Sequence, residues 1–319
     1  MKKVIFHILF IYLILTLLSS SQSKLIIQKV AVAYGLNNQY TYPTIVSMTS
    51  ILENRFSHTY YVFYLLVDRQ TFKNDNKRKL KNLEKKYDRC EVNILEISNE
   101  IIPNANVKRY PFAAYYRLLL ADLVPEFNRI IYLDGDTLVY DDLTEMLNLD
   151  MENNIMLGFV DNSYHLAEEF GIVTYKYIVS GVLLINLKKI RKENITQQFF
   201  DFIDKYHDKL SQEDQTVINI VLYGRIGFLP PKFGIWNFID KNAVLDHNSY
   251  KNRHLGIKAY KESEILKAWN LPSILHFVRS KPWKAKTKHT HILFHEDWWK
   301  YAKMTDEFKN ILSNYGNFE

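Results

Sequence analysis

Two aspartates separated by one glycine, Asp134 and Asp136, follow a segment predicted to be a strand, residues 129–133. In an extended chain the side chains of residues i and i+2 point to the same side, so both carboxylates can converge on one cation. Gly135 permits a tight turn and the close approach of a ligand. Hard divalent cations prefer carboxylate oxygens and often complete their coordination with phosphate oxygens. The segment therefore predicts a metal site, and the alternative is a solvated turn of the kind that Asp-Gly often forms.

Several familiar signatures are absent from the sequence. Counted from Asp134, an EF-hand would need an oxygen ligand at the position of Leu138 and a glycine at that of Val139. The chain also lacks the P-loop, H-E-x-x-H and G-x-S-x-G motifs. These absences argue against an EF-hand, a P-loop kinase, a zinc protease and a serine hydrolase.

The elements that would position the aspartates alternate along the first half of the chain. Apolar, β-branched segments predict strands, and apolar residues at helical spacing or charged stretches between them predict helices. The predicted strands are residues 25–34, 60–67, 91–97 and 129–133, and the predicted helices are residues 42–53, 72–87 and 112–123. Further on, we expect strands at 156–160 and 182–187 and helices at 212–222 and 298–312. The pattern indicates an α/β fold with a mostly parallel central sheet, helices on both faces, and ligands at the carboxyl ends of the strands.

The N-terminus has the layout of a secretory signal peptide. Lys2 and Lys3 precede an apolar run over residues 4–18, and a serine-rich stretch suits cleavage after Ser23. The run is shorter than the ~20 residues of a typical membrane span, although an uncleaved signal anchor remains the alternative. We therefore expect a signal peptide or anchor over residues 1–23 and one domain over residues 24–319, with a nucleotide-binding front half and a substrate-side back half.

Composition limits the partners. The 319 residues are 47% hydrophobic, which suffices for a large core, and the single cysteine, Cys90, excludes an intramolecular disulfide. The formal charge is +6, and loss of the leader with its two lysines leaves 6 − 2 = +4. The sequence has no basic patch interleaved with aromatic residues, so it does not predict nucleic-acid binding. The triplet Asn194-Ile195-Thr196 is a possible N-glycosylation site, which fits a glycoprotein of the secretory pathway.

Six features in a fixed order carry a resemblance to a known family. They are an N-terminal strand with an N-x-x-Y-like loop, Tyr116-Arg117-Leu118, the L-D-G-D of residues 133–136, S-G-V-L-L-I-N-L of 180–187, Asp214-Gln215, and H-F-V-R-S-K-P-W of 276–283. Together they resemble glycosyltransferase family 8, the retaining transferases that include glycogenin and lipopolysaccharide galactosyl- and glucosyltransferases. The resemblance extends from about residue 28 to residue 284. It implies a GT-A fold, which is a Rossmann-like nucleotide-diphospho-sugar transferase, together with a UDP-sugar donor and Mn²⁺ or Mg²⁺.

The resemblance also implies roles for individual residues. The metal ligands would be Asp134, Asp136 and His276, with Gly135 between the two acids. Lys281 would add a positive charge at the donor diphosphate, and Arg117 would contact the donor or support the acids.

The remaining implied roles concern the donor sugar and the nucleoside. The catalytic residues would be Gln215, close to the anomeric carbon, Asp214 beside it, and Asp161, which would contact the sugar. Gly181 would let the backbone approach the sugar. Uracil and ribose would lie near residues of the first loop, namely Tyr34, Asn37, Asn38 and Gln39.

Some positions depart from the family pattern. Val179 stands where an asparagine is common, and Thr216 where many members have a third acid. The C-terminal motif usually reads H-x-x-G-x-x-K-P-W, but this chain has Arg279 in place of the glycine and is one residue shorter. The resemblance implies that the altered positions face the uracil, the donor sugar and the diphosphate.

The leading interpretation is a Mn²⁺-dependent retaining hexosyltransferase that moves glucose or galactose from a UDP-sugar to a glycan, glycolipid or glycoprotein. A leader and a nucleotide-sugar donor together point to the lumen of the endoplasmic reticulum or Golgi, or to secretion, with membrane contact only if the leader is retained. The alternatives are a catalytically inactive nucleotide-sugar-binding relative, self-glycosylation of a tyrosine as in glycogenin, and a nucleotidyltransferase. The acceptor, the linkage and the oligomeric state are not predicted.

Overall fold

The computed structural model describes residues 27–102, 105, 111–161, 163–174, 176–237, 259–284 and 292–316. The predicted leader, residues 1–23, lies outside these ranges. Within them, no helix combines the length and apolar character that crossing a bilayer requires.

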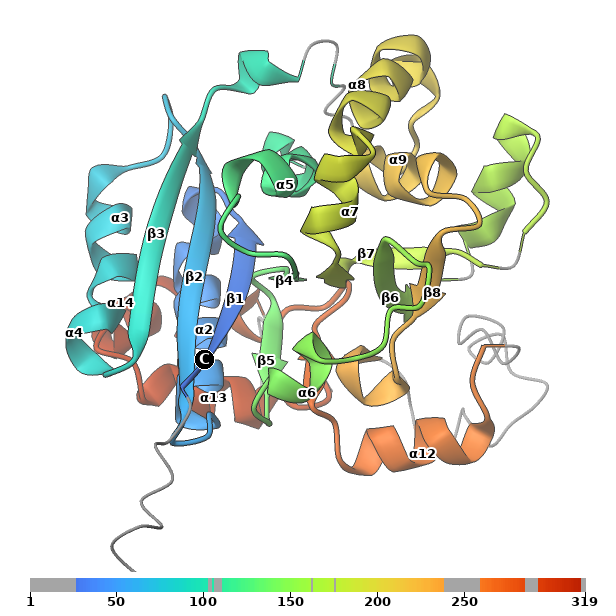
Figure 1. Ribbon diagram of the computed structural model, residues 1–319. Helices are drawn as coiled ribbons and strands as arrows, with labels where there is room; N and C mark the ends of the chain where they lie inside the picture. The colour runs from blue at the N-terminus through green and yellow to red at the C-terminus, as the bar shows by residue number, and fades with distance from the viewer. Residues whose placement is uncertain are drawn as a thin grey trace, which may run out of the picture.

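A seven-stranded sheet forms the centre of the molecule (Figure 1). In the order β3-β2-β1-β4-β7-β6-β8, all neighbours pair in parallel except those of β7, which runs antiparallel to both β4 and β6. The strands are β1 (Gln28–Gly35), β2 (Thr59–Asp68), β3 (Cys90–Ile97), β4 (Ile130–Leu133), β6 (Met156–Val160), β7 (Ile178–Ile185) and β8 (Ile226–Phe228). Because β7 is reversed, its amino end meets the carboxyl ends of β4 and β6 at one edge.

A second, three-stranded sheet has the order β5-β10-β9. Its strands are β5 (Thr137–Val139), β9 (Ile235–Trp236) and β10 (Ile274–His276), and β10 pairs antiparallel with β5 and parallel with β9. Only residues 134–136 separate β4 from β5, so these residues form the corner between the two sheets.

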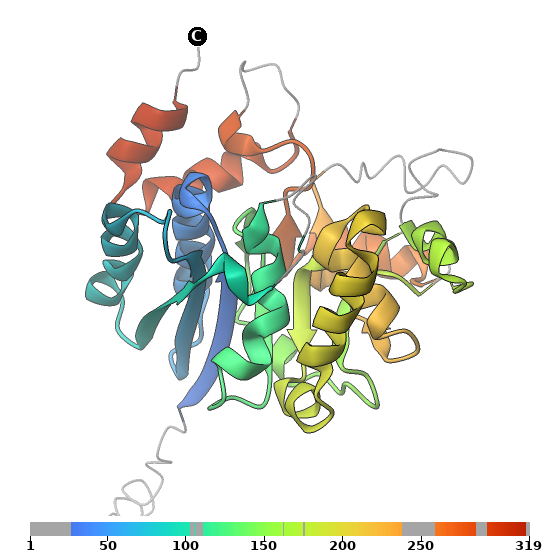
Figure 2. The same ribbon diagram turned by 90° about the horizontal axis from the view of Figure 1, so that it is seen from above.

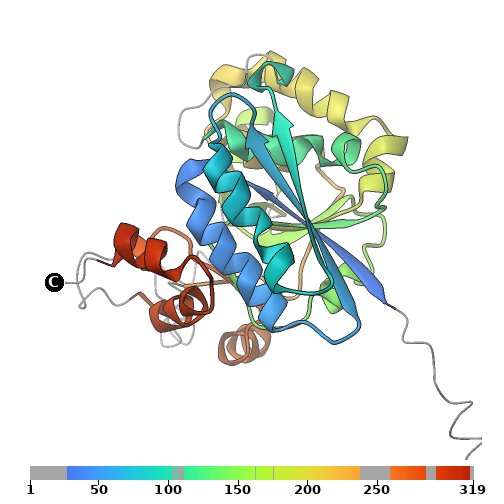
Figure 3. The same cartoon turned by 90° about the vertical axis from the view of Figure 1, so that its left-hand side faces the viewer.

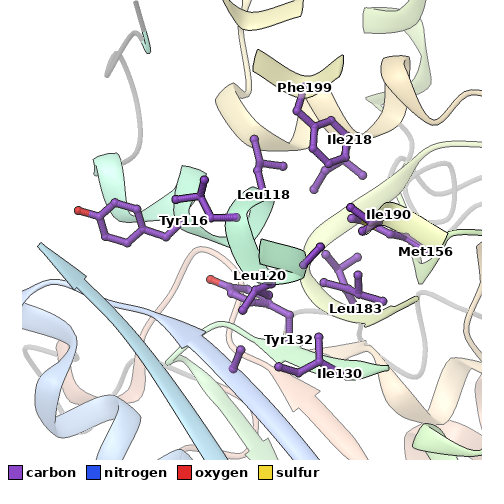
Figure 4. Close-up of a cluster of buried hydrophobic side chains, with 14 of the residues drawn as sticks. Tyr116, Leu118, Leu120, Ile130, Tyr132, Met156, Leu183, Ile190, Phe199 and Ile218 are labelled. Carbon is purple, nitrogen blue, oxygen red and sulfur yellow. The ribbon is translucent and has the colours of Figure 1, made fainter. Parts of the chain in front are cut away.

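Helices cover both faces of the large sheet (Figure 3), and side chains that alternate along β1 pack against the helices on each side. Val30, Val32 and Tyr34 face the side of α2 (Thr41–Glu53) and α3 (Asn74–Lys81). Ala31 and Ala33 face the opposite cluster, part of which Figure 4 shows. Helices on that second side are η3 (Phe112–Leu119), α5 (Leu120–Leu123), α7 (Leu187–Lys192), α8 (Ile195–Tyr206) and α9 (Glu213–Val221).

The C-terminal segment packs as an outer layer against α2 and the small sheet (Figure 2). It consists of η7 (Pro282–Lys284), α13 (His295–Lys303) and α14 (Phe308–Tyr315). Trp283 and Trp298 are buried there with ring centroids 5.2 Å apart. The other elements are η1 (Asn38–Tyr40), α4 (Leu83–Lys86), η2 (Asn99–Ile101), α6 (Thr144–Leu147), η4 (Ser163–Phe170), η5 (His207–Lys209), η6 (Pro231–Phe233) and α12 (Glu262–Asn270).

The α/β class and the mostly parallel sheet are confirmed, with corrections to individual elements. The helix predicted for residues 72–87 is two short helices, α3 and α4, and the one predicted for 112–123 begins as a 3-10 helix, η3. The helix predicted for 298–312 is also two, α13 and α14, and β7 begins at Ile178 rather than residue 182. Helical periodicity does not reveal such breaks, because the apolar faces of the two short pieces both point to the core.

Candidate active site

The corner between the two sheets brings together side chains that lie 140 residues apart in the sequence. Thr137 of β5 pairs with His276 of β10, and the Phe277 amide donates to the Asp136 carbonyl over 2.9 Å. As a result, His276 Nε2 lies 3.1 Å from Asp136 Oδ1 and 3.8 Å from Asp134 Oδ2. One ligand atom from each of Asp134, Asp136 and His276 lies within 4.8 Å of the others.

This cluster fits a divalent cation. It offers two carboxylates, which both Mn²⁺ and Mg²⁺ prefer, and one imidazole, which suits Mn²⁺ better than the harder Mg²⁺. The side chains of Asp136 and His276 are almost fully buried, whereas that of Asp134 is 30% exposed, so a phosphate ligand could reach the cluster from the side of Asp134.

Two glycines allow the segments at this corner to pack closely. The Gly181 carbonyl accepts from the Asp134 amide over 2.8 Å, and a Cβ on Gly181 would overlap the His276 ring and lie 2.7 Å from Asp134 Oδ2. A Cβ on Gly135 would overlap the Thr44 hydroxyl on α2. Glycine at both positions is therefore required by the protein's own close packing, apart from any approach of a donor.

Arg117 links the corner to the start of α9. Its guanidinium lies 3.1 Å from a carboxylate oxygen of Asp134 and 3.1 Å from one of Asp214. It also donates to the Ser180 carbonyl and stacks over the Tyr132 ring, 4.1 Å from the ring centroid. Arg117 is only 5% exposed, so its charge depends on these two acids for compensation.

Burial and nearby positive charges shift the pKa values of the two buried acids, Asp214 and Asp136, in opposite directions. Burial raises the pKa of Asp214 to about 6, although Arg117 opposes the shift. Burial also disfavours the charged form of Asp136, but there the Lys281 ammonium and His276 prevail and hold the pKa of Asp136 well below its usual range. Asp136 is therefore ionised at neutral pH, as a metal ligand must be.

Gln215 and Asp161 meet at the same edge of the sheet. Gln215 Nε2 donates to Asp161 Oδ2 over 2.8 Å, and Gln215 Oε1 accepts from the Ser180 amide over 3.2 Å. Asp161 Oδ1 accepts from the amide and hydroxyl of Ser163, each at 3.0 Å. The structure thus places both side chains beside β7, and both are half-buried.

The first loop, near which uracil and ribose are expected, uses several of its side chains within the fold. Tyr34 is fully buried in the core and its hydroxyl lies 3.0 Å from Ser47 Oγ, so its side chain has no surface for a nucleoside. Asn37 caps η1, because Oδ1 accepts from the Gln39 and Tyr40 amides. Gln39 is exposed.

Asn38 holds the loop against the segment that leads into α3. Its amide nitrogen donates to the Thr71 carbonyl over 2.9 Å, and its oxygen accepts from the Lys73 amide and the Asn76 side chain, each at 2.9 Å. A donor contact through the side chains of Tyr34, Asn37 or Asn38 would thus compete with the fold.

Three residues at the site were given no role in the sequence prediction, although two of them belong to the motifs. Tyr40 is half-buried beside Gly135, and its ring meets that of Trp283 edge-on with centroids 6.1 Å apart. Ser180 connects Arg117 and Gln215 through its backbone. Asn219 is buried and bonds both backbone groups of Ile178, which fixes the edge of β7 next to α9. A polar residue on the apolar side of a helix, as Asn219 is, was the signal available in the sequence.

The structure also places the residues that depart from the family pattern. Val179 is half-buried and packs against an apolar cluster that contains Trp236, while Thr216 is fully buried. Arg279 has φ of 66°, in the left-handed region that glycine adopts most easily. The glycine common at this position in the family therefore has a backbone reason.

The fold and the site define a GT-A glycosyltransferase. The galactosyltransferase LgtC in complex with donor and acceptor sugar analogues superposes with a TM-score of 0.70 at 19% identity, covering 89% of this chain and 100% of that one. The glycosyl transferase family 8 model matches residues 31–287. Within the GT-A class, the chain belongs to glycosyltransferase family 8, as the motifs predicted.

Curated relatives agree with this assignment. General stress protein A of Bacillus subtilis is 30% identical over 241 residues, which cover 73% of this chain and 79% of that protein. The lipopolysaccharide 1,2-glucosyltransferase of Escherichia coli is 24% identical over 294 residues, covering 88% and 77%. Other relatives are longer. A putative glycosyltransferase of Haemophilus influenzae is 27% identical over 214 residues, which cover 65% of this chain and 63% of that protein.

Proposed function

We propose that this chain transfers a hexose, glucose or galactose, from a UDP-sugar to a glycan, glycolipid or glycoprotein acceptor with retention of anomeric configuration. The observation that carries the proposal is the convergence of Asp134, Asp136 and His276 at the sheet edge where Gln215 and Asp161 also lie. The glucosyl- and galactosyltransferases among its relatives support the choice of sugar.

In this proposal Asp134, Asp136 and His276 hold Mn²⁺ or Mg²⁺. When bound, the ion would neutralise negative charge on the diphosphate of the departing UDP. Arg117 orients Asp134 through their ion pair, and Lys281 supplies a further positive charge for the phosphates.

Gln215 and Asp161 would contact the donor sugar through their half-buried polar groups. The Ser180 amide donates to the oxygen of the Gln215 side chain and so fixes the orientation of that side chain. A fixed amide dipole can stabilise the charge that develops at the anomeric carbon. Asp214 is 3% exposed and faces Arg117, so we assign it to positioning Arg117 and not to the reaction itself, a revision of its predicted catalytic role.

For the nucleoside we propose Tyr40 in place of Tyr34. An aromatic face can stack on a base, and of the two rings only that of Tyr40 is partly exposed, next to Gly135 at the metal corner. Val179 and Arg279 motivate a second candidate, a relative that binds UDP-sugar without turnover.

UDP release separates these candidates. The purified chain is incubated with a panel of UDP-sugars, with and without Mn²⁺, beside an Asp134→Asn variant. Hydrolysis of one donor that requires Mn²⁺ and is lost in the variant supports the transferase and identifies its sugar. Metal-dependent UDP binding without release from any donor would favour the binding protein, and the absence of UDP binding would refute both.

The predicted leader leads us to propose a secretory-pathway lumen as the site of action. Asn194, in the possible glycosylation site, is exposed at the start of α8, which gives a test. In eukaryotic cells an endoglycosidase should shift the electrophoretic mobility of the chain but not that of an Asn194→Gln variant. A chain with its leader that is digested by protease added to intact membranes would contradict the proposal.

A further inference from the structure

Lys281 makes a contact that its predicted diphosphate role does not explain. Its ammonium lies against Asp136 Oδ2, on the carboxylate whose other oxygen faces His276, and also donates to the Phe277 carbonyl. The Lys281 side chain is 14% exposed and that of Asp136 is 6% exposed, so this is a largely desolvated ion pair.

The pair has an electrostatic reason. A buried carboxylate without a partner is strongly unfavourable, and Arg117 already serves Asp134 and Asp214. Lys281 is the cation that neutralises Asp136. A divalent ion held by Asp136 would repel an ammonium on the same carboxylate, and at low local dielectric this repulsion is large.

The backbone around Lys281 is fixed, so only its side chain is free to move. The Ser280 carbonyl accepts from Asn237 Nδ2 over 3.1 Å, and the Lys281 carbonyl accepts from the Lys284 amide over 3.0 Å. Just beyond, Trp283 is buried against Trp298. The flexible stem of lysine allows its ammonium to exchange partners without moving this segment.

We propose that the Lys281 ammonium takes the place of the divalent metal ion at Asp136 while that ion is absent. When the metal and the UDP-sugar bind, the ammonium moves to the donor phosphates. Lys281 then has two opposite effects: it competes with the metal for Asp136, and it strengthens binding of the nucleotide. The inference rests on the proposed function, because it assumes that Asp136 is a metal ligand and that a diphosphate binds nearby.

The test measures the two effects separately. Mn²⁺ binding to the full chain is followed by electron paramagnetic resonance without nucleotide, and UDP binding by calorimetry at saturating Mn²⁺. Lys281→Met should bind Mn²⁺ alone about tenfold more tightly and UDP about tenfold more weakly than the wild type, a coupling of ordinary size. Lys284→Met, which removes an exposed lysine three residues further on, at the end of η7, is the control and should change neither.

The outcomes separate the inference from the function beneath it. A wild type that binds Mn²⁺ and UDP, with Mn²⁺ affinity unchanged or weakened in Lys281→Met, overturns the inference and leaves the proposed function intact. A wild type that binds neither refutes the proposed function, and the inference fails with it.

A measurement on the wild type covers the case in which Lys281→Met does not fold. Lysines are reductively methylated with ¹³C, and the Lys281 signal is assigned by its absence from Lys281→Arg. We expect this signal to shift on addition of Mg²⁺ and to shift again with UDP. A signal unmoved by both additions would overturn the proposal.

Discussion

The metal corner and the first loop were predicted from the same family resemblance, yet the structure treats them differently. At the corner, Asp134, Asp136 and His276 turn their side chains toward one point. In the first loop, the side chains of Asn37 and Asn38 bond the protein's own backbone, and Tyr34 belongs to the core. The difference teaches that a motif indicates which residues gather at a site, whereas the fold decides which side chains remain available to a ligand.

Removal of Arg117 should have the largest effect, because it supports the corner. Arg117→Met leaves Asp134 and Asp214 without their shared cation, and we expect a loss of about 3 kcal/mol in the free energy of unfolding. Urea denaturation measures it. Arg78→Met, which breaks an exposed pair with Asp75, is the control and should cost at most about 1 kcal/mol. Equal losses in the two variants would mean that Arg117 does not hold the corner together.

Gly181→Ala tests the close packing of the corner. The added methyl would displace His276 and Asp134, so we expect turnover to fall about 100-fold, as when a preorganised charged site is disturbed. Initial rates of UDP release measure it. Gly227→Ala introduces a similar clash with Leu157 and Asn154, away from the corner, and should lower stability without a selective loss of activity. Comparable rate losses in the two variants would contradict this account.

The raised pKa of Asp214 predicts a pH dependence of stability. Because burial raises its pKa to about 6, the native state binds a proton more tightly than the unfolded state. The Asp214 contribution is therefore fully present at a pH below the unfolded pKa of 3.8 and is lost as the pH rises through about 6, by roughly 3 kcal/mol in total. Unfolding measured from pH 4 to pH 7 should show this decline in the wild type, and Asp214→Asn should not show it. Parallel curves would argue against the shift.

In the first loop, Tyr40 and Tyr34 give a direct contrast. Tyr40→Ala should raise the KM for the UDP-sugar about tenfold, because a base loses its stacking surface. Tyr34→Phe removes only the buried hydroxyl and should leave KM unchanged. Steady-state kinetics measure both, and the reverse result would restore the original assignment to Tyr34.

Asn38→Ala should have the smallest effect on activity. It removes three hydrogen bonds that join the loop to residues 71–76, and about 1 kcal/mol of stability should be lost with kcat unchanged. Thermal unfolding and initial rates together test this. A large rise in KM with unchanged stability would show that Asn38 contacts the donor instead.

The sequence predicted the strands of the front half well, because a strand buried on both faces of a central sheet appears as a continuous run of apolar, β-branched residues. It also predicted that Asp134 and Asp136 would point the same way. It did not predict the reversed direction of β7 or the pairing of β5 with β10, because strand direction and long-range register depend on tertiary contacts. The same contacts place His276 at the corner, and only the family resemblance indicated that residue in advance.

Mn²⁺ binding in the presence of UDP tests the central claim most directly. Electron paramagnetic resonance should count one bound Mn²⁺ per wild-type chain and a binding weakened at least about 100-fold in Asp136→Asn, since the variant loses a buried charged ligand. An Asp136→Asn variant that binds Mn²⁺ with the stoichiometry and affinity of the wild type would contradict the assignment of this corner as the metal site.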